Sequence, residues 1–258
     1  MKIGMMNNPR FELCGEIAWA KKNGFDYLDL TLEPPAFHAA KFKLPEVKGA
    51  LREWGLGIVG HTAYYLPIAS PYDSLRQAAL EEMHWALRVF AELGASTVTI
   101  HPDKSIAFAL SPKEVLQKNL ESLEKIFRLA EPLGLRILIE NMDRTFNNVE
   151  QIREALDRIP RLGFHLDVGH ANLNVEQNRT AKFLQAFRER LAHVHFSDNF
   201  GKSEDMHLPL GAGNIPWSKI VGMLKDSGYD GTITLEIFSA DRRYLLFSRD
   251  KVKELWGS

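Results

Sequence analysis

Hydrophobic positions along this chain follow two alternating patterns. Short apolar, β-branched segments are typical of buried strands, and between them lie longer stretches in which apolar residues recur with helical spacing. The segment 73–94 shows the helical pattern, because Leu75, Ala79 and Met83 recur at helical spacing and Gly94 is suited to a C-cap. The expected strands are 2–7, 27–32, 57–63, 96–102, 136–141, 162–168, 192–198 and 233–238.

Helix boundaries carry signals of their own. A second helix is expected over 111–134, where Ser111 is an N-cap, Pro112 takes the first helical position and Glu114 completes a capping box. Several helices are followed by a Gly and then at once by a strand, as in "ELGASTVTI" and "EPLGLRILI". Gly is suited to this place because it adopts the left-handed conformation that ends a helix.

The alternation of strand and helix predicts the fold. Eight strand and helix units favour parallel strands with right-handed crossovers, and such units close into a barrel. The prediction is therefore an α/β protein with a single (β/α)8 TIM barrel domain over 1–258, a usual length for that fold. An open doubly wound sheet is less well supported, because "NNPRFELCGE" after the first strand lacks the Gly-rich phosphate-binding fingerprint.

Composition narrows the classes of partner. The 32 Lys and Arg against 33 Asp and Glu leave a net charge of −1, so no global field attracts nucleic acid or anionic lipid. A single Cys14 excludes an internal disulfide and suits a reducing compartment. The N-terminal segment has too short an apolar run for a signal peptide, and no stretch approaches the roughly 18 apolar residues of a membrane span. We expect a cytoplasmic protein without a membrane partner.

Polar residues of metal-ligand type cluster where the strands end. In a TIM barrel these C-terminal ends and the following loops carry the catalytic groups. A single His in a strand is usually a hydrogen-bonded core residue, but Glu140 and Glu236 each place a carboxylate in an apolar strand, where an unpaired charge is costly. A divalent ion would neutralise the cluster, and mixed imidazole and carboxylate ligands suit zinc, manganese, cobalt or iron. The candidate residues are His61, His101, Glu140, Asp167, His170, His195, Asp205, His207 and Glu236.

The ordered motifs resemble those of the xylose isomerase-like TIM barrel superfamily. That group includes sugar phosphate isomerases and epimerases, D-tagatose 3-epimerase relatives, inosose isomerases and endonuclease IV. The resemblance covers nearly the whole chain and implies the barrel fold, but it does not select a substrate. The motifs that carry it are "IEN" with Glu140, "LDVGH" with Asp167 and His170, "HVHFSD" with His195, "DMHLPLGAGNIPW" with Asp205 and His207, and "TLEIF" with Glu236.

Two branches of the superfamily imply different sites. The epimerase branch implies one divalent metal ion bound by Glu140, Asp167, His195 and Glu236, with His170 in contact with the substrate. The endonuclease IV branch implies three zinc ions, and all nine of its ligand positions have counterparts here, including His61, His101, Asp205 and His207. Ligand types alone therefore do not decide between the branches.

The favoured prediction is a divalent-metal-dependent isomerase or epimerase acting on a sugar, sugar phosphate or polyol. Its chemistry is proton abstraction next to a carbonyl with a metal-stabilised enediolate, and Glu140 and Glu236 are the expected catalytic groups. Phe146 and Gly201 stand where tagatose epimerase-like enzymes carry a substrate-contacting Glu and an Arg, so that particular substrate is not implied. The alternative is an endonuclease IV-like zinc-dependent abasic-site phosphodiesterase.

Other features set the remaining expectations. The loop charges nearly cancel, so nucleic acid is not the expected partner. A catalytically silent barrel would more naturally have lost some ligand residues, and a homo-oligomer remains open. Four loop aromatic residues are candidates for packing either on sugar C–H faces or within the loops themselves: Tyr64, Phe108, Phe146 and Phe200. Four further histidines are expected to be structural or to support the ligands: His38, His84, His165 and His193.

Overall fold

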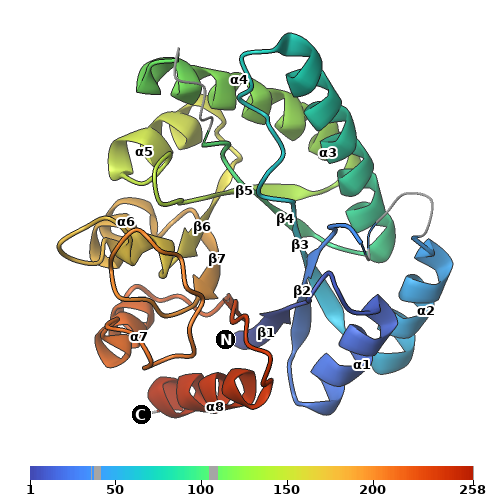
Figure 1. Cartoon of the computed structure of the whole chain (residues 1–258), viewed down its shortest axis with the longest axis vertical. Coiled ribbons are helices and arrows are strands. Elements are labelled where there is room, and N and C mark those ends of the chain that lie inside the picture. Colours follow the sequence, from blue (N-terminus) through green and yellow to red (C-terminus); the bar gives the residue numbers. More distant parts are fainter. Residues whose placement is uncertain (36, 38–41, 105–109, 258) are drawn as a thin grey trace.

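A closed barrel of eight parallel strands forms the centre of the molecule (Figure 1). The structure, a computed structural model, describes residues 1–35, 37, 42–104 and 110–257. The strands follow one another around the barrel in chain order, and the last pairs with the first through the register Ile3↔Ile233. The helices form an outer ring around the strands (Figure 1). The predicted (β/α)8 TIM barrel is confirmed, and the doubly wound sheet is excluded.

All eight expected strands are present, and each is shorter than predicted. Because β4 ends at Ile100 and β8 ends at Leu235, His101 and Glu236 are the first residues after those strands. The strands are β1 (Lys2–Met6), β2 (Tyr27–Thr31), β3 (Gly57–His61), β4 (Thr97–Ile100), β5 (Arg136–Glu140), β6 (Gly163–Asp167), β7 (Leu191–Phe196) and β8 (Thr232–Leu235).

The predicted caps hold at Ser111 and Gly94, whereas the helix expected over 111–134 ends at Ala130 and continues as a 3-10 helix over Glu131–Leu133, which Gly134 caps. The Ser111 hydroxyl accepts a hydrogen bond from the Glu114 amide at 3.3 Å, and the Glu114 carboxylate accepts one from the Ser111 amide at 2.8 Å. Gly94 ends its helix with φ of 88°. The helices are α1 (Leu13–Lys22), α2 (Leu44–Trp54), α3 (Asp73–Leu93), α4 (Pro112–Ala130), α5 (Val149–Arg158), α6 (Thr180–Phe187), α7 (Trp217–Asp226) and α8 (Arg243–Gly257), with short 3-10 helices η1 (Glu131–Leu133) and η2 (His170–Asn172). None of the helices in the described ranges is long and apolar enough to cross a membrane.

Alternation along the strands separates the hydrophobic core from the polar barrel interior. Phe164 of β6 packs outward against Phe183 and Phe187 of α6, with ring centroids 5.6 and 5.4 Å apart. The next residue, His165, points the other way and lies 4.1 Å from the ring of His195. The side chains that face the interior of β6 and β7 are therefore polar, while their outward neighbours bury apolar surface under the helices.

Candidate metal-binding active site

The nine predicted ligand-type residues gather at the C-terminal mouth of the barrel. Seven of them are at most 8% exposed, namely His61, His101, Glu140, Asp167, His170, His195 and Glu236. The side chains of Asp205 and His207, from the loop after β7, are 31% and 17% exposed. Buried carboxylates and imidazoles at this density need mutual hydrogen bonds or a cation, because each charge is costly to remove from water.

A first group joins Glu140 to two histidines. The Oε2 atom of Glu140 lies 3.1 Å from Nε2 of His101 and 3.6 Å from Nε2 of His61. Glu140 Oε2 and both ring nitrogens of His61 nevertheless have no hydrogen-bond partner among the described residues. Two ligand atoms bound to one tetrahedral zinc ion are roughly 3.4 Å apart, given metal bonds of about 2.0–2.1 Å. The unpartnered atoms and their separations therefore fit a divalent ion.

A second group surrounds His195. Its Nδ1 atom lies 3.2 Å from Glu236 Oε2 and 3.8 Å from Asp167 Oδ2. Asp167 Oδ2 has no hydrogen-bond partner among the residues described. Glu140 adjoins this group through its other oxygen, Oε1, which lies 3.1 Å from Nδ1 of His170. These donors again fit a divalent ion that both carboxylates and the imidazole would share.

A third group lies toward the solvent, where Asp205 Oδ2 is 3.0 Å from His170 Nε2 and 3.1 Å from His207 Nε2. The Nδ1 atoms of the two histidines face backbone carbonyl oxygens, that of Asn141 for His170 and that of Glu236 for His207, each at 3.1 Å. In the protonated histidines Nδ1–H can donate to these carbonyls and Nε2–H to Asp205, whereas in the neutral form with hydrogen on Nδ1 the Nε2 lone pair could bind a metal ion. His207 adopts a left-handed backbone with φ of 45°, a conformation that costs a His roughly 1–3 kcal/mol.

One buried carboxylate shapes the loop that carries Asp205 and His207. Asp198, at the end of β7, accepts hydrogen bonds from the amides of Asn199, Gly211 and Ile215 at 2.9, 2.7 and 3.2 Å, and from the Trp217 indole at 2.8 Å. The Asp198 amide and carbonyl also pair with Leu208 in an isolated antiparallel bridge. The loop therefore has a fixed path across the mouth although it contains no regular element.

Protonation in the metal-free site reflects the crowding of charges. Burial, together with the negative charges of Glu140 and Glu236, raises the pKa of Asp167 to about 7, although the charge of His170 lowers it. Burial would also raise the pKa of Glu140, but the charges of His165 and His101 hold it well below its usual value. Without a cation, Asp167 would therefore be partly protonated near pH 7, and a bound cation would displace that proton.

The sequence analysis did not identify Asp29. This residue lies on β2, is 0% exposed and faces the barrel interior. Its Oδ2 atom accepts hydrogen bonds from Nε2 of His193 and Nε2 of His195, both at 2.8 Å, and from the Thr234 hydroxyl at 2.7 Å. The signal was present, because "YLDLTL" places a carboxylate in an apolar strand in the same way as "ILIEN" does.

The secondary expectations have mixed outcomes. For Phe146 the structure favours packing within the protein over contact with a substrate, because its side chain is 0% exposed and belongs to the hydrophobic core. Tyr64 and Phe200 are 60% and 49% exposed and remain candidates. His165 and His193 lie one layer below Asp167 and His195, with the register His165↔His193, as expected. Phe108 and His38 lie outside the described residues, and His84 is half-buried on α3.

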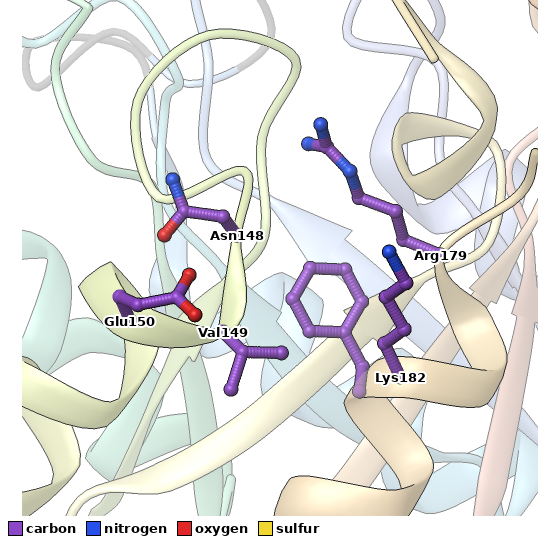
Figure 2. Close-up of a pocket in the computed structure, with 6 residues that line it drawn as sticks. Asn148, Val149, Glu150, Arg179 and Lys182 are labelled. Atoms are coloured by element: carbon purple, nitrogen blue, oxygen red, sulfur yellow. The ribbon is translucent and has the colours of Figure 1, made fainter. Parts of the chain in front are cut away.

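Figure 2 shows a pocket of about 180 Å³ between the first turns of α5 and α6. Its lining is Asn148, Val149, Glu150, Arg179, Lys182 and Phe183, and none of these is one of the nine predicted ligands. The Arg179 guanidinium donates to the backbone carbonyl of Asn147, and Glu150 brings a negative charge to the same rim. This pocket is therefore separate from the polar cluster at the barrel mouth.

Comparisons with known proteins agree with the barrel fold. The family model described as xylose isomerase-like TIM barrel matches residues 17–255. An uncharacterized protein of Methanocaldococcus jannaschii is 32% identical over 176 residues, which are 65% of this chain and 59% of that protein. A second uncharacterized protein of the same organism is 27% identical over 179 residues, which are 62% of that protein. The chain therefore spans about three fifths of the length of these two relatives.

Other matches carry names of two kinds. Fructoselysine 3-epimerase of Escherichia coli O157:H7 is 23% identical over 251 residues, covering 92% of this chain and 90% of that one. A probable endonuclease 4 of Aquifex aeolicus is 26% identical over 195 residues, covering 68% of each chain. Among solved structures, a D-tagatose 3-epimerase-like protein superposes with a TM-score of 0.87 at 26% identity, over 100% of this chain and 97% of that one.

Proposed function

Because the chain belongs to the xylose isomerase-like TIM barrel family, we propose that it is a divalent-metal-dependent isomerase or epimerase of a sugar, sugar phosphate or related polyol ketone. The observation that carries the proposal is a pair of buried carboxylates, Glu140 at the end of β5 and Glu236 directly after β8, three strands apart in a closed barrel of eight. Relatives that match this chain over most of its length, such as fructoselysine 3-epimerase, are named as sugar epimerases, which supports this substrate class.

The metal ion would be held by Glu140, Asp167, His195 and Glu236, whose donor types suit zinc, manganese or cobalt. When bound there it would supply Lewis acidity that stabilises negative charge on the substrate carbonyl oxygen. The Asp167 carboxylate would give up its proton to the solvent when the cation arrives, since its pKa of about 7 in the metal-free site reflects burial and neighbouring carboxylates.

The two glutamates would transfer the proton. Burial alone would raise the pKa of Glu236, but the charges of His207 and His195 lower it below its usual value, as neighbouring histidines do for Glu140. Both carboxylates are therefore ionised at neutral pH and can act as bases. One would accept the proton from the carbon next to the carbonyl, and the other, after taking a proton from solvent, would return it to the opposite face.

Deuterium exchange tests this proposal. In deuterated water a panel of ketoses, incubated with protein reconstituted with zinc, manganese or cobalt, should include one that gains deuterium at the carbon next to its carbonyl. The Glu236→Gln variant should lose this exchange by a factor on the order of a hundred or more, because the amide cannot take up the proton. The exposed Glu204 lies in the loop after β7, so Glu204→Gln is the matched control and should keep the exchange rate.

Two outcomes would contradict the mechanism. Turnover of a ketose without solvent label would point to a hydride shift between carbons instead of proton transfer. Full label incorporation by Glu236→Gln would exclude this residue as base. Loss of exchange in Glu204→Gln as well would mean that any change near the mouth disrupts the site.

A second candidate function is metal-dependent phosphodiester cleavage. The observation that favours it is the arrangement of all nine donors in three groups, each with nitrogen to oxygen separations of 3.0 to 3.8 Å. Clustered divalent ions stabilise both the attacking and the leaving oxygen of a phosphodiester. A match to a protein named as probable endonuclease 4 adds to this possibility. The two functions require different contacts with the substrate. A phosphodiesterase must bind the charged backbone of a nucleic acid, whereas an isomerase binds a small polyol.

A further inference from the structure

We infer that Asp29 is a positioning residue that holds His195 with Nδ1 free toward the barrel mouth and so sets the affinity of the site for a divalent metal. The inference rests on the proposed metal site. It concerns a carboxylate on β2 that is 0% exposed and lies one layer below the candidate ligands. Asp29 touches His195 but not the mouth itself, so its action is through the imidazole.

The hydrogen bonds around Asp29 determine one tautomer. An ionised carboxylate can only accept, and Asp29 Oδ2 lies 2.8 Å from Nε2 of His195. Nε2 must therefore carry the hydrogen, and in a neutral imidazole this leaves the lone pair on Nδ1. Nδ1 is the atom that faces Glu236 Oε2 at 3.2 Å and Asp167 Oδ2 at 3.8 Å. Without the acceptor below, the imidazole could place its hydrogen on Nδ1 and lose its ligand atom.

Asp29 is itself held in place from two other directions. Nε2 of His193 lies 2.8 Å from Asp29 Oδ2, and Nδ1 of His193 is 2.7 Å from the Thr232 hydroxyl at the bottom of the barrel. The Thr234 hydroxyl donates to the same Oδ2 at 2.7 Å and is in turn 2.8 Å from the Tyr27 hydroxyl. Three donors on one oxygen leave the carboxylate little freedom to rotate away from His195.

A purely structural role would look different in experiment. A buried Asp and His pair that served only folding would change the stability of the protein on mutation and leave the affinity for metal unchanged. A carboxylate that orients a metal-binding His, in contrast, typically contributes a factor of about 10–100 to metal affinity. The affinity for metal is therefore the measurement that separates the two roles, and it does not depend on knowing the substrate.

The test measures zinc affinity by competition with a chromogenic chelator, starting from protein stripped of metal. Asp29→Asn should bind zinc about 10–100-fold more weakly than the wild type, because a neutral amide oxygen is a weaker acceptor than a carboxylate and holds the His195 N–H less firmly. Thr234→Val keeps the carboxylate but removes one donor, and a fall of roughly three- to tenfold is expected. Tyr27→Phe is the matched control, since it deletes a buried hydroxyl one hydrogen bond further away and should bind zinc as the wild type does.

A spectroscopic readout accompanies the affinity. In the zinc-loaded wild-type protein, long-range proton–nitrogen spectra should show His195 protonated at Nε2 only, and Asp29→Asn should shift this resonance toward a tautomer mixture. A folded Asp29→Asn protein with wild-type zinc affinity would overturn the inference. If Asp29→Asn does not fold, wild-type affinity in Thr234→Val has the same consequence. A wild type that binds no metal would contradict the proposed function itself, whereas equal binding by wild type and variant contradicts only the role of Asp29.

Discussion

Two carboxylates of the same mouth, Asp167 and Asp205, affect folding in opposite directions in the metal-free protein. The pKa of Asp167 is raised to about 7, first by burial and then by Glu140 and Glu236, so the folded state holds a proton that the unfolded chain releases near pH 4. Its ionisation therefore costs stability as the pH rises from about 4 to 7. Burial would raise the pKa of Asp205 too, but hydrogen bonds from His170 and His207 lower it well below its usual value. Its ionisation stabilises the fold above about pH 4, and this contribution is lost on acidification.

Asp167→Asn should consequently stabilise the protein in chelator at pH 8, by up to about 4 kcal/mol, and have little effect near pH 4. Asp205→Asn is the matched comparison and should lower the free energy of unfolding at pH 8. Urea unfolding at both pH values measures these changes. When zinc is added, the sign for Asp167→Asn should reverse, because the variant loses the ion that stabilises the wild type. A destabilised Asp167→Asn protein in chelator at pH 8 would show that this carboxylate is not strained by burial.

The clustering of the ligand-type residues could be predicted from the sequence, although each residue taken alone carries little information. The nine ligand-type residues could be found because a barrel brings all strand ends to one mouth, so position along the chain specifies position in space. Asp29 was missed because it lies in the middle of its strand, below the mouth. The role of Phe146 could not be decided for a different reason, since its loop folds back into the core with φ of 55°, which no local pattern indicates.

Among the elements, the loop after β7 depends on a single side chain. The Gly211 amide and the Trp217 indole both donate to Asp198 Oδ2, at 2.7 and 2.8 Å. Asp198→Asn would keep the shape of the residue but remove its charge and turn an NH2 group toward some of these donors. Hydrogen bonds to a buried charge are worth roughly 1.5–3 kcal/mol each, so we expect a loss of about 3 kcal/mol in the free energy of unfolding. Amide hydrogen exchange should also accelerate over residues 199–215.

Ser111→Ala provides the control for this experiment. It removes the N-cap of α4 and should cost about 1 kcal/mol, while exchange in the loop after β7 stays unchanged. Unchanged loop exchange in Asp198→Asn would show that other contacts suffice to hold Asp205 and His207. The contrast also shows what could be predicted from sequence. The cap of α4 was predictable because its partners are three residues apart, whereas the loop depends on Asp198 contacts up to 19 residues away.

Over the whole molecule, charge balance bears on the choice between isomerase and nuclease. A nuclease must bind the DNA backbone with several cations free to contact phosphate, and its affinity falls steeply with salt. Here the net charge is −1, and cations near the mouth already face carboxylates. Lys104 lies 2.7 Å from Asp143, and Arg243 lies 2.6 Å from Asp241. A small polyol would need only the metal ion and a few hydrogen-bonding groups.

We therefore predict that zinc-reconstituted protein does not efficiently cleave duplex DNA containing an abasic site, even at low salt, where phosphate contacts are strongest. Binding of the same duplex should be weak and should change little between 50 and 200 mM salt, since few counterions would be released. The same protein preparation should exchange deuterium into its ketose, which shows that the site is loaded and active. Efficient nicking at the abasic position would contradict the isomerase. If this nicking is lost in Glu236→Gln, the result supports the phosphodiesterase, because cleavage of the phosphate ester would then depend on a carboxylate of the proposed site.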